Sequence, residues 1–161
     1  MYFQTMNIPF GPITLFSTND KIISIKFCKT KGNYPNKILN EASFQINAYF
    51  NGRLNRFDLP IKTIGTAFQK KVWKQIIHIP YGKTLNYKQI AKNLKSSPRA
   101  VGHACGKNPI PIIIPCHRVL GSNNKLGGYS FANGKQTKLS LLKIENINKF
   151  FIIFHNNQRK N

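Results

Sequence analysis

The stretch TLNYKQIAKNLKSSPRAVGHAC, residues 84–105, decides the fold of the second half of this chain. Its pattern predicts a short helix over residues 87–94, capped by Thr84 or Asn86. Ser97 then caps a second helix, which begins with a proline. Two short helices joined by a tight turn indicate a helix-turn-helix, although many such helix pairs are only packing units.

The residues before this stretch predict a different kind of structure. Alternating apolar and polar residues up to about position 30 are typical of strands. Residues 36–50 change to a helical pattern, which Gly52 would end. Residues 58–65 have the composition of a linker, and Thr66 is a candidate N-cap for the next helix, whose Trp73 we interpret as a core residue.

We therefore expect an α+β fold with two domains. A small, strand-rich N-terminal α/β domain with its linker would span residues 1–62. A mainly helical C-terminal domain with the helix-turn-helix would span residues 63–148. Residues 149–161 contain a short apolar run and form an atypical tail, which is too short to cross a membrane.

The charge balance of the chain indicates a polyanionic partner. The 161 residues include 25 Lys and Arg but only four Asp and Glu, which gives a formal net charge of +21. An AT-rich genome would favour Lys, but it would not remove Glu, whose codons are also AT-rich. We therefore favour a nucleic-acid partner over a merely solvated basic surface.

Three cysteines, Cys28, Cys105 and Cys116, lie far apart in the sequence and form no CxxC pair. This spacing predicts neither a disulfide framework nor a zinc site, and reduced thiols fit a cytoplasmic location. No signal-peptide pattern opens the chain. We interpret Cys28 and Cys105 as small, buried apolar side chains.

The run Pro115–Val119, with the sequence PCHRV, carries the strongest chemical signal. It follows the apolar residues 112–114, which we interpret as a strand, and it places the thiol of Cys116 directly before the imidazole of His117. A thiol is a weak nucleophile until it loses its proton, and an adjacent imidazole can remove that proton. Glu145 is the best candidate to orient the imidazole, because an unpaired carboxylate in its apolar surroundings would be costly to bury; the alternative is a solvated helix position.

Two further segments are candidates for a pocket around this thiol. Asn108 follows the second predicted helix, where it ends the helix, bridges to the loop that carries Cys116, or does both. Gly127 and Gly128 permit a close approach of the backbone, and the adjacent residues 129–130, Tyr and Ser, could form the wall of a flat pocket.

Taken together, these motifs resemble those of the methylated-DNA–protein-cysteine methyltransferases, which repair O6-methylguanine by moving the methyl group onto their own cysteine. The matching motifs are Tyr81–Thr84, Tyr87–Ala91, Arg99–Gly102, Asn108-Pro109, Pro115–Val119 and Gly128-Tyr129. The match runs from about residue 65 to residue 145, and the segment 130–138 is slightly longer than the usual spacing. The N-terminal portion is similar only in its order of strands followed by a helix, and the resemblance implies a small ribonuclease H-like domain there.

The resemblance implies that the helix-turn-helix binds double-stranded DNA through the minor groove. Arg99 would enter the base stack in place of an extruded nucleotide, while Ala100 and Gly102 would let the helix approach the groove floor. Tyr87 would push on the 3′ phosphate and hydrogen-bond the flipped guanine. Flipping fits the chemistry, because the O6-alkyl carbon cannot be attacked in line inside a stacked duplex.

The resemblance also implies a pocket and a reaction. The expected pocket residues are Asn108, Val119, Tyr129 and Ser130. His117, oriented by Glu145, would take the proton of Cys116 through a water molecule, and the thiolate would attack the alkyl carbon. The resulting thioether is too stable to hydrolyse, so each monomer would act once, without a metal or an organic cofactor; O4-methylthymine is a possible second substrate.

Three other classes of protein remain as alternatives. A non-enzymatic sensor of alkylated DNA would keep the DNA-binding helix but would usually replace the reactive cysteine. A helix-turn-helix regulator would need no set of Cys, His and Glu. A thiol hydrolase would turn over many substrate molecules without being stoichiometrically modified.

Overall fold

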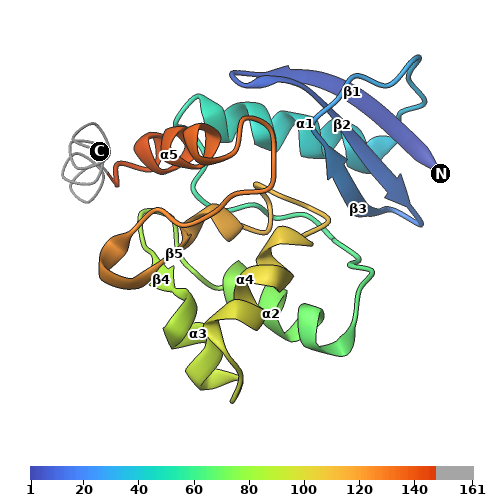
Figure 1. The fold of residues 1–161 in the computed structure, drawn as a ribbon. Coiled ribbons are helices and arrows are strands. Elements are labelled where there is room, and N and C mark those ends of the chain that lie inside the picture. Colours follow the sequence, from blue (N-terminus) through green and yellow to red (C-terminus); the bar gives the residue numbers. More distant parts are fainter. Residues whose placement is uncertain (148–161) are drawn as a thin grey trace. The chain divides into compact units, whose positions relative to one another are not determined.

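The computed structural model describes residues 1–147, so the tail expected at 149–161 lies outside the described residues (Figure 1). The chain divides into two compact units. The first contains residues 1–65 together with 109–113, and the second contains 66–108 and the residues from 114 onward. Within 1–147, no helix is both long enough and apolar enough to cross a membrane.

The first unit is built on an antiparallel sheet of three strands in chain order. The strands are β1 (Tyr2–Ile8), β2 (Gly11–Thr18) and β3 (Lys21–Lys26). Asn19 and Asp20 both have positive φ and form the two-residue turn between β2 and β3, as this kind of tight hairpin requires. The buried face of the sheet includes Ile13, Leu15 and Ile22, so the strands expected before residue 30 are confirmed.

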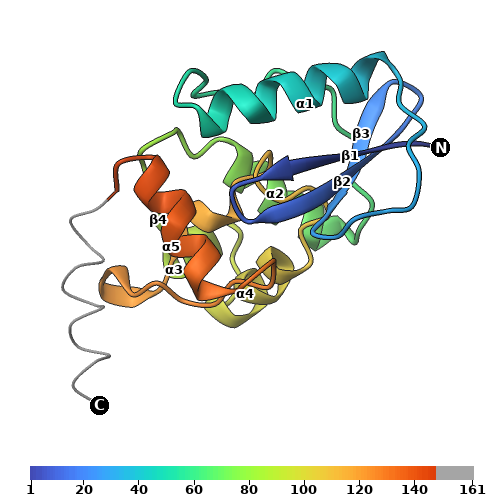
Figure 2. The same cartoon turned by 90° about the horizontal axis from the view of Figure 1, so that it is seen from above.

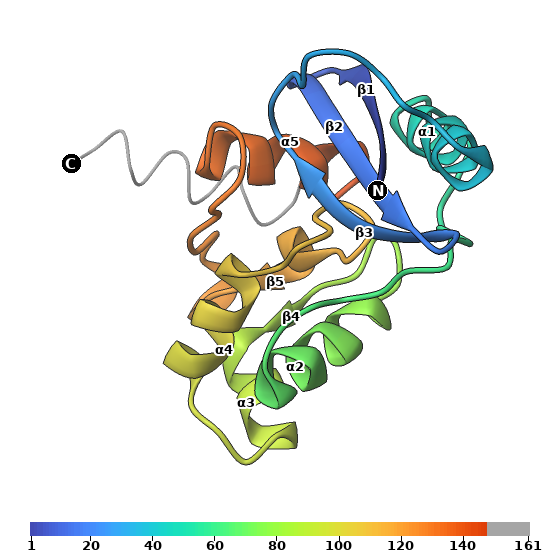
Figure 3. The same ribbon diagram turned by 90° about the vertical axis from the view of Figure 1, so that its right-hand side faces the viewer.

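One helix, α1 (Lys37–Phe50), packs against this sheet, as Figures 2 and 3 show. Its N-cap is Asn36, whose side chain accepts a hydrogen bond from the backbone N–H of Leu39. Ile46 and Tyr49 are fully buried on its inner face. The sequence pattern predicted this helix because its apolar residues recur at three- and four-residue steps.

Part of the predicted linker 58–65 is instead paired with the sheet. The N–H of Ile22 donates to the carbonyl of Pro60 at 2.9 Å, and the N–H of Lys62 donates to the carbonyl of Ile22 at 2.8 Å. A strand edge presents unpaired backbone groups, and these bonds satisfy some of them on β3. Composition alone could not reveal this pairing, because it depends on a partner nearly forty positions away.

The second unit is mainly helical. Its helices are α2 (Ala67–Ile77), α3 (Tyr87–Asn93), α4 (Pro98–Gly106) and α5 (Lys135–Ile144), with the short 3-10 helices η1 (Cys116–Arg118) and η2 (Ser122–Asn124). Two short strands, β4 (Leu85–Asn86) and β5 (Val119–Leu120), pair in parallel. The β4–β5 pairing brings the residues just after η1 beside the residues just before α3.

The helix-turn-helix has the capping that its sequence predicted. Asn86, and not Thr84, caps α3 through a reciprocal capping box with Gln89. The Ser97 side chain accepts from the N–H of Ala100 at the start of α4. Trp73 of α2 is buried and donates its indole N–H to a carbonyl of α4 at 2.9 Å, which confirms its place in the core.

Two local predictions are wrong. Residues 112–113 form a turn and not a strand, with Ile112 at a φ of 75°. The run is apolar because it is buried, and a short buried run cannot be distinguished from a strand by periodicity alone. Cys28 is exposed, since it lies in a bend just beyond the end of β3.

Candidate functional site

Cys116 is the first residue of η1 and is only 3% exposed. The amide nitrogen Nδ2 of Asn108 donates to the carbonyl of Ile114 at 2.8 Å and lies 3.2 Å from Sγ of Cys116. The expected bridge from the end of α4 to the loop that carries Cys116 is therefore present. The contact with the sulfur itself was not predicted, and it fixes the position of the thiol.

Burial controls the acidity of this thiol. It raises the pKa of Cys116 to about 11, although the hydrogen bond from Asn108 and the nearby charge of Lys138 act in the opposite direction. The thiol is therefore protonated at neutral pH and cannot act as a nucleophile without a base.

His117 is fully buried next in the chain, and its Nε2 bonds to the carboxylate of Glu145. A carboxylate only accepts hydrogen bonds, so Nε2 carries the hydrogen of the neutral imidazole and Nδ1 keeps its lone pair. Within the described residues, Nδ1 has no hydrogen-bond partner. Burial, together with the positive charges of Arg118 and Lys138, lowers the pKa of His117 against the raising effect of Glu145, so the ring is a neutral base at rest.

Glu145 directly follows α5 and is 1% exposed, so it is not the solvated helix position considered as the alternative. Its second oxygen accepts from Nε of Arg118 at 2.7 Å, and Nη1 of Arg118 donates to the carbonyl of Ile79 at 2.6 Å. Burial alone would raise the pKa of Glu145, but its bond to His117 and the charge of Arg118 outweigh burial and lower it. The carboxylate is therefore ionised.

Arg118 was missed among the predicted site residues, although the sequence contained a signal. It belongs to the PCHRV run, and a buried carboxylate that binds a neutral imidazole still needs a cation. The guanidinium lies 5.9 Å from the ring of Tyr81, whose hydroxyl donates to the carbonyl of Ile144 at 3.0 Å. Arg118 thus joins the carboxylate to the segment that follows α2.

A cavity of about 350 Å³ lies beside Cys116. Tyr87 of α3, Gly102 and Cys105 of α4 and the segment 128–131 form its other walls. The volume is within the range of small-molecule sites. Tyr129 and Ser130, both predicted for the pocket, line this cavity.

Other predicted residues lie outside the cavity wall. Asn108 is buried behind Cys116, and the carbonyl of Val119 accepts from Lys138 at 2.6 Å. Arg99 is exposed in the first turn of α4, where Ala100 follows it. Their roles in binding remain predictions.

Lys138 is not among the site residues predicted above, because the longer segment 130–138 left its match to the family's lysine open. It is fully buried on α5, and its Nζ donates to the carbonyls of Val119 and Gly128 and lies 3.5 Å from the hydroxyl of Tyr87. Burial lowers its pKa to about 8. A lysine four residues into a helix has no sequence signal for burial, because its partners are carbonyls of distant loops.

Tyr87 keeps its proton in this environment. Burial, and then the nearby thiols of Cys105 and Cys116, raise the pKa of its hydroxyl above its ordinary value. Gly127 lies against its ring at a φ of 71°, where a Cβ atom would come within 3.2 Å of a ring carbon. Glycine is therefore required there by both backbone and space.

Cys105 is buried, as predicted, but it also lines the cavity. Burial, with a smaller contribution from Cys116, raises its pKa to about 12. Burial and position in the cavity therefore do not show which of the two thiols is the nucleophile, but their neighbours do. Only Cys116 is in contact with the side-chain amide of Asn108 and directly precedes the histidine that Glu145 holds.

Comparisons with known proteins agree with this architecture. Two family models match, the ribonuclease-like domain of 6-O-methylguanine DNA methyltransferase over residues 1–63 and its DNA-binding domain over residues 67–147. Together they cover nearly all the residues described above. The chain therefore belongs to the 6-O-methylguanine DNA methyltransferase family.

Curated relatives and a solved structure support the same conclusion. A methylated-DNA–protein-cysteine methyltransferase of Methanosarcina barkeri is 44% identical over 92% of this chain and 99% of its own. One of Mycobacterium tuberculosis is 38% identical over 90% and 92% of the two chains. The crystal structure of the M. tuberculosis OGT protein in complex with DNA is similar with a TM-score of 0.81, at 38% identity over 90% and 92%.

These matches confirm the resemblance, the α+β fold with a ribonuclease-like first half, and the enzyme class expected from the sequence. They favour an alkyltransferase over a thiol hydrolase and over a regulator that merely binds DNA. Within residues 1–147, no cluster of three or more His, Cys, Asp or Glu could hold a metal ion.

Proposed function

We propose that this protein repairs DNA by moving the alkyl group from O6 of guanine to Sγ of Cys116, once per molecule. The observation that carries the proposal is the order of the buried groups. Cys116 lines a cavity. His117 follows it, and its Nδ1 has no protein partner within the described residues. Glu145 holds the other ring nitrogen, Nε2.

The proton of Cys116 leaves through His117. Because the thiol is protonated at neutral pH, attack requires a base, and the neutral imidazole supplies one at Nδ1 through a water molecule. The imidazolium that forms is stabilised by Glu145, which Arg118 keeps ionised. Arg118 is a positioning residue in this scheme, because it acts only through Glu145.

The thiolate then displaces guanine from the alkyl carbon. A C–S bond forms, the C–O6 bond breaks, and its electron pair goes to the purine. Tyr87 keeps its proton and donates a hydrogen bond to O6 of the departing base, and the ammonium group of Lys138 beside it helps to stabilise the negative charge on that base. The base takes up a proton from solvent after it has left. The thioether does not hydrolyse, so the protein is consumed.

Access to the alkyl carbon requires that the base leave the duplex. We assign this step to the helix-turn-helix in the minor groove, with Arg99 replacing the extruded base and Ala100 and Gly102 close to the groove floor. The exposed Arg99 at the start of α4 and the net charge of +21 support DNA binding. The pocket contacts of Asn108, Val119, Tyr129 and Ser130, and activity on O4-methylthymine, belong to the same proposal.

We further propose that residues 63–148 carry both DNA binding and transfer, that residues 1–62 form a supporting domain, and that the protein acts as a cytoplasmic monomer. Every residue of the Cys116 cavity comes from the larger of these segments. Size-exclusion chromatography with light scattering would test the oligomeric state, and a stable dimer would contradict it.

The test of the transfer reaction is the intact mass of the protein after mixing with a duplex that contains O6-methylguanine, followed by peptide mapping. We expect one hydrogen to be replaced by one methyl group on Cys116, with a yield that stops at one per protein. Tight binding without a mass change would indicate a damage sensor. Continued release of product with no modified protein would indicate a hydrolase.

A further inference from the structure

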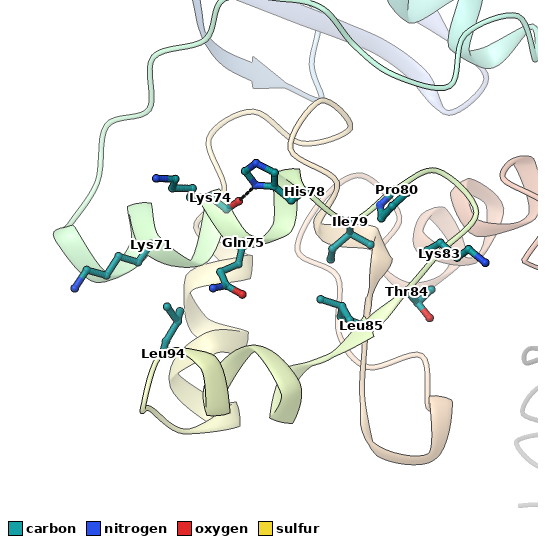
Figure 4. Close-up of a pocket in the computed structure, with 10 residues that line it drawn as sticks. All are labelled: Lys71, Lys74, Gln75, His78, Ile79, Pro80, Lys83, Thr84, Leu85 and Leu94. Atoms are coloured by element: carbon teal, nitrogen blue, oxygen red, sulfur yellow. Dashed lines mark hydrogen bonds between the residues drawn. The ribbon is translucent and has the colours of Figure 1, made fainter.

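A second cavity, of about 540 Å³, lies on another part of the second unit (Figure 4). It is formed by α2, by the segment that leads into β4, and by Leu94 at the end of α3. None of its lining residues also lines the cavity at Cys116. We call it the lysine groove, after Lys71, Lys74 and Lys83.

The floor of the lysine groove is apolar, and a side-chain hydrogen bond joins the two helices beside it. Ile79 is buried, and Leu85 and Leu94 are half-buried, so part of each leucine faces solvent. Figure 4 shows Leu85 and Leu94 directed into the space between α2 and α3. Nδ2 of Asn93 donates to the side-chain oxygen of Gln75 at 3.2 Å, which joins the two helices across this space.

The charges around this floor are unmatched within the described residues. Lys71, Lys74 and Lys83 are exposed, and neither of the two ion pairs involves them. No acidic residue lines the groove. The second unit's Glu145 is buried and already holds His117 and Arg118.

His78 adds a polar group at the same place. Its Nδ1 lies 2.7 Å from the carbonyl of Lys74, and a carbonyl only accepts, so Nδ1 donates this hydrogen bond. Nε2 is then the ring nitrogen left for a ligand. The groove thus combines exposed apolar surface, three cationic side chains and an imidazole.

We propose that the lysine groove binds an acidic amphipathic helix of another protein, in which leucine-like side chains recur at helical spacing and Asp and Glu occupy the other positions. The apolar residues would cover Leu85 and Leu94, and the carboxylates would pair with Lys74 and Lys83. Helix-in-groove recognition uses this combination of apolar anchors and a complementary charged rim.

Other occupants fit the groove less well. No Phe, Tyr or Trp lines it, so a single-stranded nucleic acid would find one aromatic ring, that of His78, and no row of rings on which successive bases could stack. A second copy of this chain carries a net charge of +21 and would be repelled. Residues 148–161 contain Lys149, Arg159 and Lys160 but no acidic residue, so their charge is not complementary either.

The probe is a fluorescein-labelled synthetic peptide of roughly fourteen residues, with Leu at helical spacing and Asp or Glu elsewhere. A second peptide has Ser in place of every Leu and the same net charge. Fluorescence anisotropy with the full chain at physiological salt should show that the Leu peptide binds about tenfold more tightly or better, since only it can cover the apolar floor.

Two double variants test where the peptide binds. Lys74→Glu with Lys83→Glu reverses charge in the groove, and Lys21→Glu with Lys37→Glu makes the same change in net charge at exposed positions of the first unit. The first should weaken binding about tenfold, and the control by no more than about twofold. Circular dichroism melts establish that both variants are folded.

Three outcomes would overturn the proposal. Equal affinity for the two peptides, or equal loss in the two double variants, would mean that the charge of the whole protein attracts the probe. A larger loss of affinity for undamaged single-stranded DNA than for the peptide in the groove variant would make the groove a nucleic-acid contact. None of these measurements depends on alkyl transfer, so the proposed repair reaction can fail or succeed separately.

Discussion

The cluster around Cys116 and the lysine groove differ in whether their charges are buried and paired. Around Cys116, the buried carboxylate of Glu145 is matched by His117 and Arg118, and no charge in that set faces solvent. In the lysine groove, the cations are exposed and have no acidic partner within the described residues. Buried charges need partners inside the protein, because leaving them unpaired would destabilise the fold. Exposed charges are hydrated and stay available to bind another molecule. Internally paired charges are therefore expected where a reaction needs fixed groups, and unpaired exposed charges where an acidic partner binds.

The largest effect should come from removing the thiol. Cys116→Ala should abolish alkyl transfer while binding to alkylated DNA persists, because the nucleophile is lost and the DNA-binding helix is not. Cys105→Ala is the matched control, since it removes the other thiol of the same cavity. Transfer measured with a radiolabelled methyl group should persist in the control, and transfer by the Cys116 variant would rule out our assignment of the nucleophile.

The next effect should come from neutralising the internal carboxylate. Glu145→Gln should slow transfer by about a hundredfold or more, because the amide cannot stabilise the imidazolium of His117. Asp20→Asn, in an exposed turn of the first unit, is the control and should leave the rate unchanged. Single-turnover rates on free O6-benzylguanine measure this, and a change of less than about threefold would contradict the role of Glu145.

Breaking the ion pair should reduce stability. Arg118→Met removes the cationic partner of the buried Glu145 carboxylate, and we expect the free energy of unfolding to fall by about 3–5 kcal/mol, with a partial rescue in Arg118→Lys. Urea unfolding would measure both, and equal stability of Met and wild type would show that the pair adds nothing. The pH dependence has a definite sign: the lowered pKa of Glu145 stabilises the fold above the unfolded value of about 4.3, and this contribution is lost as pH falls through the folded pKa.

A smaller effect concerns the pH profile of transfer. Because the folded pKa of His117 lies below its ordinary value of about 6.5, the rate should stay level from about pH 7 to below pH 6.5 and fall only at more acidic pH, where the base is protonated. Rates on free O6-benzylguanine over this range would show it. A decline that already begins above pH 7 would mean that the base is not this buried imidazole.

The smallest effect should be that of the lysine groove on transfer. Lys74→Glu with Lys83→Glu should leave the rate on free O6-benzylguanine within about twofold, because neither residue lies in the Cys116 cavity and exposed charges act weakly at a distance. A large loss of rate in a folded variant would show that the two sites are coupled.

Local signals explain what the sequence predicted well. The caps of α3 and α4 depend on residues within three positions of each other, so Asn86 and Ser97 could be recognised directly. The set of Cys116, His117 and Glu145 could be predicted for a different reason: two are adjacent, and the third is one of only four acidic residues.

Long-range burial explains what the sequence did not predict. The burial of Lys138 depends on carbonyls at Val119 and Gly128, which no pattern connects to it. The turn at Ile112 looked like a strand because burial, and not extension, made the run apolar. The lysine groove combines residues from α2, β4 and α3, each of which alone resembles an ordinary solvated or core position.

The high pKa of the Cys116 thiol also affects how fast the unreacted protein is oxidised. Thiolates, and not thiols, attack peroxides and disulfides, so a sulfur that stays protonated until a substrate arrives is slow to oxidise. For a protein that is spent in a single reaction, every molecule lost to oxidation is one fewer repair. The burial that keeps the Cys116 thiol protonated thus also protects the unreacted protein from oxidation.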